Sequence, residues 1–93
     1  MSERHVAHVI VHGEVQGVCF RACLQREAAS AGVAGWCRNR FDGTVEALLC
    51  GPRAAVDRVV AWCRHGPPMA RVTDLDITRD VPDPGDVGFR VRG

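Results

Sequence analysis

The sequence predicts an α+β fold in which two helices pack on one face of a mainly antiparallel sheet. Several short runs alternate apolar with polar residues, and two longer segments repeat apolar residues at helical spacing. These segments follow one another in the order strand, helix, strand, strand, helix, strand, with a possible last strand. That order predicts a ferredoxin-like split βαβ sandwich (βαββαβ).

The first strand is predicted over residues 5–12. Ala7, Val9 and Val11 fall on one face, and His8 and His12 share the other. The two histidines suggest a metal site, but no third ligand follows at a recognisable spacing. We therefore interpret them as surface or edge residues of the strand.

The first helix is predicted to begin at Phe20. Its apolar positions follow helical spacing, and Gly32 is a favourable stop. They are Phe20, Cys23, Leu24, Ala28 and Ala31. We expect this helix to bury one stripe against the sheet.

A hairpin is predicted from two extended runs, residues 35–40 and 44–50, around the turn pair Asp42-Gly43. Asp42 is better explained as a turn former than as an acid catalyst. Pro52 is expected at the first position of the second helix, which residues 65–68 end.

The last part of the chain is less regular. Over residues 70–78 the apolar side chains change phase, which a bulge or an edge position explains. Residues 81–88 form a loop rich in proline, aspartate and glycine, and residues 88–92 are expected to form a final edge strand.

Composition limits the function further. The 93 residues predict a single domain over 1–93, and 46% are hydrophobic. A net charge of +1 with mixed signs gives no footprint for nucleic acid or a membrane. The five cysteines include no Cys-x-x-Cys pair, and no apolar leader stands near Met1, which favours a reduced, cytoplasmic location. Most cysteines are expected in the core, whereas Cys19 lies in a loop.

A glycine-containing loop, residues 13–20, joins the first strand to the first helix and offers almost no reactive side chain. Backbone N–H groups that converge at a helix start form an anion site. Arg21 supports this prediction, because a cation in the first turn is unfavourable by roughly 0.3–1 kcal/mol unless an anion is bound there.

Two motifs carry a family resemblance. Residues 13–21, Gly-Glu-Val-Gln-Gly-Val-Cys-Phe-Arg, resemble the signature loop of the acylphosphatase family. Residues 35–46, Gly-Trp-Cys-Arg-Asn-Arg-Phe-Asp-Gly-Thr-Val-Glu, resemble its second signature. The resemblance covers about residues 6–91. Cys37 stands where the family commonly has valine, a small apolar exchange.

The resemblance implies hydrolysis of acyl phosphates to a carboxylate and inorganic phosphate, with no metal and no cofactor. It implies that Arg21 holds the phosphoryl oxygens and that Asn39 orients the attacking water. The backbone of the loop would complete the phosphate site, through Glu14, Val15, Gln16, Gly17, Val18, Cys19 and Phe20. We expect a monomer that acts on a small-molecule acyl phosphate.

The chemistry agrees with this set of groups. No convincing general acid or base accompanies them, but a carboxylate leaving group, whose conjugate acid has a pKa of about 4, departs without protonation. A phosphate monoester usually requires an acid or a metal. The residues therefore favour acyl phosphates as substrates.

Other functions stay open at this stage. A non-catalytic module that binds phosphate or acyl phosphate would keep the loop and Arg21 but would not need Asn39. An RNA-binding sheet requires exposed aromatic residues, and only 5% of this chain is aromatic. A domain that serves a larger carbamoyl-transfer enzyme would need further domains.

Overall fold

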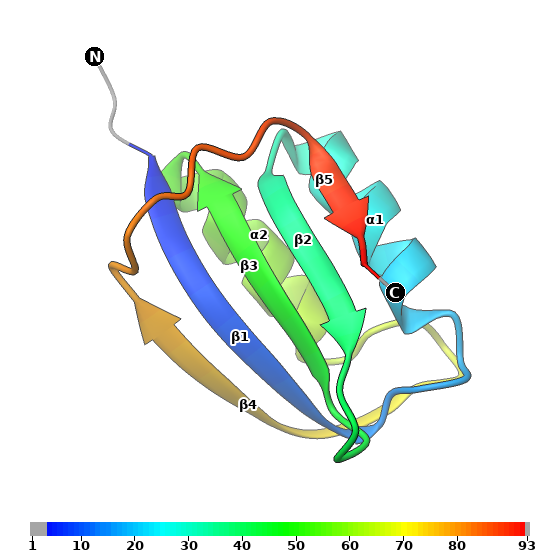
Figure 1. The fold of residues 1–93 in the computed structure, drawn as a ribbon. Coiled ribbons are helices and arrows are strands. Elements are labelled where there is room, and N and C mark those ends of the chain that lie inside the picture. Colours follow the sequence, from blue (N-terminus) through cyan, green and yellow to red (C-terminus); the bar gives the residue numbers. More distant parts are fainter. Residues whose placement is uncertain (1–3, 93) are drawn as a thin grey trace.

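The computed structural model describes residues 4–92, so residues 1–3 and 93 of the predicted domain lie outside the description. One sheet forms a single layer, and two helices cover one of its faces (Figure 1). The elements are β1 (His5–Glu14), α1 (Phe20–Ala31), β2 (Ala34–Asn39), β3 (Val45–Gly51), α2 (Arg53–Cys63), β4 (Arg71–Arg79) and β5 (Phe89–Val91). The ferredoxin-like α+β prediction is confirmed.

The sheet has the strand order β4-β1-β3-β2-β5. All neighbouring strands are antiparallel except β2 and β5, which are parallel. β1 and β2 run in the same direction on either side of β3, and α1 connects them. This is the split βαβ arrangement that the order of elements predicted.

The core lies between the sheet and the helices. The predicted inner face of β1 is fully buried there, through Ala7, Val9 and Val11. His8 and His12 lie on the opposite, open face and are partly exposed. β1 pairs on both sides, so these histidines are surface residues of a central strand and not edge residues.

Register within the sheet aligns the ends of β1 and β2. Val45 of β3 pairs with Val11 on one side and with Asn39 on the other. The loop that leaves β1 and the last residue of β2 therefore emerge at the same edge of the sheet. The pairing brings together two motifs that lie far apart in the sequence.

Most predicted boundaries are confirmed. α1 begins at Phe20, and Gly32 ends it with a left-handed backbone. Pro52 lies at the N-cap of α2, one position earlier than expected, because its carbonyl already accepts the hydrogen bond from Val56 N–H. β4 is an edge strand, and its register against β1 shifts between His12 and Gly13, which accounts for the change of phase.

Among residues 4–92, neither α1 nor α2 has the length and the apolar composition of a membrane-spanning helix.

Gly35 lets β2 and β3 approach closely. Its φ is +131°, and a Cβ at this position would collide with the carbonyl oxygen of Leu48. Gly43 at the hairpin tip also has a positive φ, +89°, but nothing lies within 4 Å of the place where its Cβ would be. A side chain at either position would destabilise the fold through the positive φ, but only at Gly35 would it also clash with neighbouring backbone.

We expect Gly35→Ala to lower the free energy of unfolding by about 3 kcal/mol or more, because the clash involves backbone that cannot move aside. Gly43→Ala should cost only about 1 kcal/mol, the cost of the positive φ. Urea denaturation of the two variants measures the difference. Equal losses would show that the close approach of β2 and β3 is not the constraint.

Candidate functional site

A cavity of about 410 Å³ opens where the loop, α1, β2 and β5 meet. Its lining includes Arg21 and Asn39, both predicted from the sequence as site residues. The full lining is Val15, Gly17, Cys19, Phe20, Arg21, Ala22, Gln25, Asn39 and Val91. Residues from four elements thus share one small cavity.

The loop backbone is turned so that its N–H groups are available. Gly17 and Cys19 have left-handed φ angles of 75° and 64°. Among residues 4–92, no N–H group of residues 15–19 donates a hydrogen bond to another protein atom. Cys19 is the N-cap of α1 and makes no side-chain cap, so the first-turn N–H groups lack that partner too.

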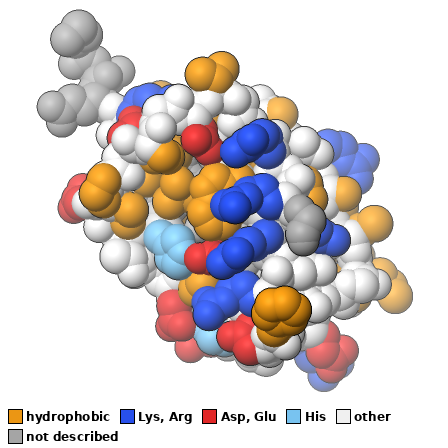
Figure 2. Space-filling view, viewed as in Figure 1, with side chains coloured by type: hydrophobic (Ala, Val, Ile, Leu, Met, Phe, Trp, Pro, Cys, Tyr) orange, Lys and Arg blue, Asp and Glu red, His pale blue; other side chains and the backbone are white. Residues whose placement is uncertain are grey.

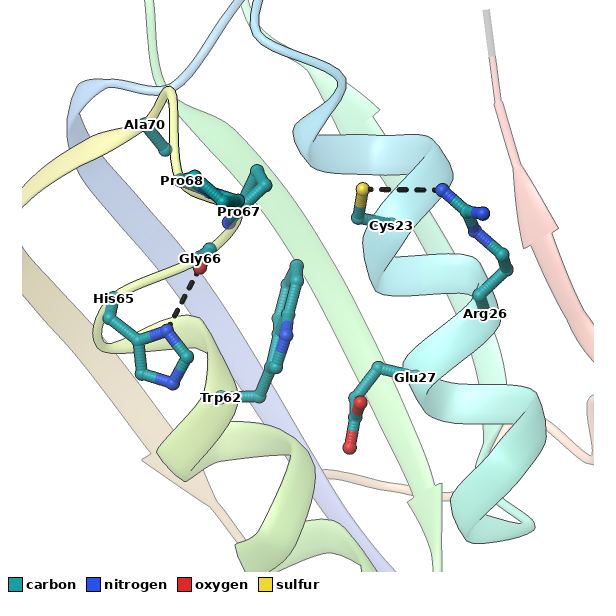
Figure 3. Close-up of a pocket in the computed structure, with 9 residues that line it drawn as sticks. All are labelled: Cys23, Arg26, Glu27, Trp62, His65, Gly66, Pro67, Pro68 and Ala70. Carbon is teal, nitrogen blue, oxygen red and sulfur yellow. Dashed lines mark hydrogen bonds between the residues drawn. The ribbon is translucent and has the colours of Figure 1, made fainter.

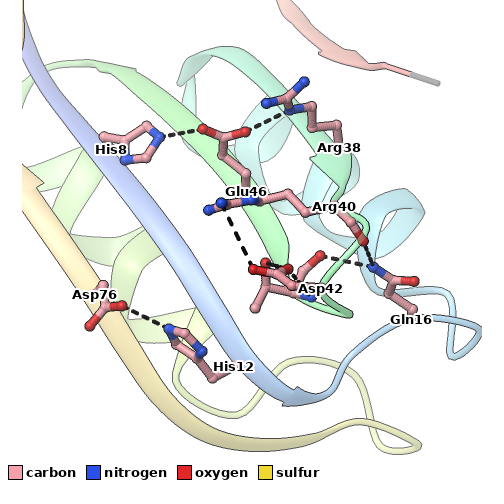
Figure 4. Close-up of polar contacts among 9 residues, drawn as sticks. His8, His12, Gln16, Arg38, Arg40, Asp42, Glu46 and Asp76 are labelled. Carbon is pink, nitrogen blue, oxygen red and sulfur yellow. Dashed lines mark hydrogen bonds and ion pairs between the residues drawn. The ribbon is translucent and has the colours of Figure 1, made fainter.

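Buried side chains and one tether fix the loop in place. Val15 and Phe20 are almost fully buried in the core. The Nε2 amide of Gln16 donates to the carbonyl oxygens of Arg40 at 2.8 Å and Thr44 at 3.0 Å, which joins the loop to the β2–β3 hairpin (Figure 4). The loop is therefore attached to the element that carries Asn39.

Arg21 contacts the residue that follows β5 through its side chain, and a cysteine of β2 through its backbone. Its Nη1 donates to the carbonyl oxygen of Arg92 at 3.2 Å. The thiol of Cys37, on β2, lies 3.9 Å from the backbone oxygen of Arg21. Burial raises the pKa of the Cys37 thiol to about 11, although the charge of Arg21 opposes the rise. Cys37 therefore remains a neutral core residue, as expected for the position where valine is common.

Asn39 is the last residue of β2, and its side chain lines the same cavity. Its Oδ1 atom is buried and accepts no hydrogen bond from any of residues 4–92. Buried polar atoms are almost always paired, so this oxygen retains the capacity to accept a hydrogen bond from a water or a ligand.

Some predicted site residues lie beside the cavity without lining it. Glu14 ends β1 opposite Arg71 and is exposed. Val18 packs against the core, and the side chain of Gln16 faces the hairpin. These residues are predicted to bind phosphate through their backbone, and the placement of their side chains outside the cavity is compatible with that prediction.

The structure adds three lining residues that sequence reasoning missed: Ala22, Gln25 and Val91. Gln25 follows Arg21 by four positions, so helical spacing alone could have placed it on the same side of α1. Val91 lies opposite Cys37 because β5 pairs with β2, and no local pattern reveals that pairing.

The open face of the sheet carries both a small apolar cluster, which includes Val6, Leu48 and Trp36, and a group of charged side chains. Arginine side chains form a column over the β2–β5 side of this face (Figure 2). Glu46 accepts hydrogen bonds from His8 Nε2 and Arg38 Nε, both at 2.6 Å, and His12 pairs with Asp76 at 2.7 Å (Figure 4). The two histidines considered as metal ligands thus each contact a carboxylate.

Glu46 is the most buried carboxylate in this network, with a side chain 13% exposed. Burial by itself would raise its pKa, but the hydrogen bonds from His8 and Arg38 outweigh burial and hold the pKa below its ordinary value of 4.5. Asp42 instead accepts hydrogen bonds from the backbone and hydroxyl of Thr44, which confirms it as a turn former.

A second hollow, of about 730 Å³, lies between α1 and the segment after α2 (Figure 3). It contains none of the predicted site residues, and its walls include Cys23, Glu27, Trp62 and His65. The rings of Trp62 and Phe20 lie 5.2 Å apart, so Trp62 is a packing residue that supports the end of the loop.

Comparison with known proteins points to one family. The family model described as acylphosphatase matches residues 7–91. An acylphosphatase of Anaeromyxobacter sp. is 50% identical over 93 residues, covering 99% of both chains, and one of Gloeobacter violaceus is 53% identical, covering 83% of both. The crystal structure of acylphosphatase from Bacillus subtilis superposes with a TM-score of 0.92 at 38% identity, covering 96% of this chain and 99% of that one.

The low pKa of Glu46 makes part of the stability depend on pH. The group binds a proton less readily when folded than when unfolded, so its contribution is present above pH 4.5 and is lost as the pH falls through the folded value. We expect Glu46→Gln to be less stable than the native protein by about 1–2 kcal/mol at pH 7, and the gap to narrow near pH 3.

Urea denaturation at several pH values measures this gap. Glu14→Gln serves as the control, because Glu14 is exposed and forms no ion pair among residues 4–92. A Glu46→Gln gap that stays constant from pH 7 to pH 3 would contradict the role given to these hydrogen bonds.

Proposed function

Because the chain belongs to the acylphosphatase family, we propose how its own residues divide the work of hydrolysing an acyl phosphate. The backbone of residues 14–20 and Arg21 hold the phosphoryl group, and Asn39 orients the attacking water. The family assignment makes the chain a hydrolase that cleaves the carboxyl–phosphate bond. The division of roles rests on the geometry of the cavity.

The phosphoryl group is bound by donors that have no other partner. The N–H groups of residues 15–19 make no protein hydrogen bond within residues 4–92, and the start of α1 adds the positive end of its dipole. A phosphate there also offsets the cost of Arg21 in the first turn. Arginine suits this position because its planar guanidinium can donate two parallel hydrogen bonds to phosphate oxygens.

The attacking water is oriented by Asn39. Its buried Oδ1 accepts a hydrogen bond from one O–H of the water, which directs a lone pair of the water oxygen toward phosphorus. The water oxygen forms a bond to phosphorus while the bond from phosphorus to the acyl oxygen breaks. The electron pair leaves with the carboxylate, and the water proton passes to phosphate or solvent.

This step places little demand on acid–base groups. The leaving carboxylate is a weak base whose conjugate acid has a pKa of about 4, so it needs no proton donor. Positioning and stabilisation of charge can then supply most of the rate enhancement. The narrow set of groups around the cavity is sufficient for an acyl phosphate.

One observation carries the proposal: loop residues, Arg21 and Asn39 line the same cavity of about 410 Å³, and the buried Oδ1 of Asn39 has no hydrogen-bond partner among residues 4–92. The alternative, a module that binds phosphate or acyl phosphate without turnover, explains the loop and Arg21. It gives no reason for a buried Asn39 Oδ1 without a partner. The proposed enzymatic function accounts for the loop and Arg21 and also for the buried Oδ1 of Asn39.

We further propose that residues 1–93 act as one domain and as a monomer on a small-molecule acyl phosphate in the cytoplasm. The family model spans residues 7–91, and strands from both ends of the chain share the sheet. The five cysteines are all free, and three of them are buried as core residues, which suits a reducing compartment.

We expect Arg21→Ala and Asn39→Ala each to lower kcat/KM for an acyl phosphate by about 10²-fold or more, the scale of losing one charge-stabilising or positioning contact. Arg90→Ala is the control for Arg21→Ala, because Arg90 is exposed on β5 and does not line the cavity. Release of phosphate from benzoyl phosphate, with chelator present, measures the rates.

Inhibition by inorganic phosphate separates the two roles. Arg21→Ala should weaken phosphate binding, whereas Asn39→Ala should largely preserve it. Equal loss of phosphate affinity in both variants would contradict the separate roles. Saturable phosphate binding with no turnover by the native protein would favour the binding module.

A further inference from the structure

The cavity is larger than the phosphate site. In the proposed function, the loop, Arg21 and Asn39 hold the phosphate and the water. Three further residues line the cavity, Ala22, Gln25 and Val91, and we call them the shelf. Nothing in the proposed handling of phosphate and water uses these three residues.

The shelf is formed by α1 and β5. Ala22 and Gln25 stand in the first and second turns of α1, and Val91 lies on β5 opposite Cys37 of β2. Val91 is 39% exposed, an apolar side chain that the core leaves partly uncovered at the cavity. Its neighbour on the same side of β5, Phe89, packs against the core instead.

Two hydrogen bonds hold the shelf together. Gln25 Nε2 donates to the carbonyl oxygen of Phe89 at 3.1 Å, and Arg21 donates to that of Arg92 at 3.2 Å. These bonds fasten α1 to β5 and to the residue that follows it, on both sides of Val91. The shelf is therefore fixed relative to Arg21. A surface that distinguishes one acyl group from another must be fixed relative to the phosphate site in this way.

The charge and polarity of the lining side chains limit which acyl groups the shelf can contact. Arg21 is the only charged side chain that lines the cavity in the described chain, and Gln25 is the only uncharged polar one besides Asn39 and the Cys19 thiol. In-line attack places the water and the leaving group on opposite sides of phosphorus. An acyl group held by its phosphate therefore extends away from the water at Asn39.

We propose that the acyl group of the substrate lies on the shelf, so that the enzyme selects acyl phosphates whose acyl group is uncharged and apolar. This inference rests on the proposed function, because it takes the phosphate to be bound by the loop and Arg21. Val91 is its main specificity-determining residue. The larger hollow beside Trp62 shares no residue with this cavity and plays no part.

The test compares benzoyl phosphate with acetyl phosphate, which carry the same reacting group but different apolar areas. Contact with the shelf should make kcat/KM higher for benzoyl phosphate. The ratio of the two values should fall about 3- to 10-fold in Val91→Thr, which keeps the shape of valine but replaces one methyl group with a hydroxyl, and in Val91→Ala. Val91→Leu should keep or raise the ratio.

Val87→Thr and Val87→Ala are matched controls, because Val87 is a 94% exposed valine in the preceding loop and lies outside the cavity. The ratio should be unchanged in both. Inhibition by inorganic phosphate is measured in every variant to monitor the phosphate site.

The outcomes separate the two proposals. A benzoyl-to-acetyl ratio that stays constant along the Val91 series, with phosphate inhibition intact, overturns the shelf and leaves the proposed function standing. A native protein that binds phosphate but hydrolyses neither compound overturns the proposed function and the shelf together.

Discussion

The site depends on β3 lying between β1 and β2. Antiparallel pairing on both sides of β3 forces β1 and β2 to run in the same direction, so the loop and Asn39 reach the same edge. Neighbouring strands lie about 4.8 Å apart, so the ends of β1 and β2 are separated by about 10 Å. Two directly adjacent strands would leave no such gap. The intervening strand thus leaves a gap between the two motifs, which the proposed binding of a phosphoryl group and a water requires.

The loop holds its shape at some cost in backbone energy. Cys19 adopts a left-handed conformation, with φ 64° and ψ 21°, that a residue with a side chain adopts only at a cost of about 1–2 kcal/mol. Burial of Val15 and Phe20 and the tether from Gln16 offset that cost. The N–H groups are then oriented before any ligand arrives, which is the condition for effective electrostatic stabilisation.

The two faces of the sheet make different kinds of contact. The inner face packs against the helices. The cavity opens at the edge of the sheet where β1 and β2 end. The open face carries ion pairs, of which the contacts of Glu46 link β1, β2 and β3. The short strand β5 joins β2 by parallel pairing and also bonds to α1, so the last residues of the chain complete the wall of the cavity.

The sequence alone determined the local parts of this structure. The helical spacing of Phe20, Leu24 and Ala28 and the stop at Gly32 define α1, and Asp42-Gly43 defines the hairpin, because these signals act between residues close in the chain. The two motifs likewise predicted the loop, Arg21 and Asn39 as the residues of the site. The tertiary structure alone decided that His8 and His12 lie on a central strand, that Asn39 Oδ1 has no partner within residues 4–92, and that Val91 borders the cavity. These features depend on pairing and packing between distant segments, such as His8 and Thr78, which are 70 residues apart in the chain. A local pattern of apolar and polar residues indicates that a side chain is buried but not which distant strand buries it.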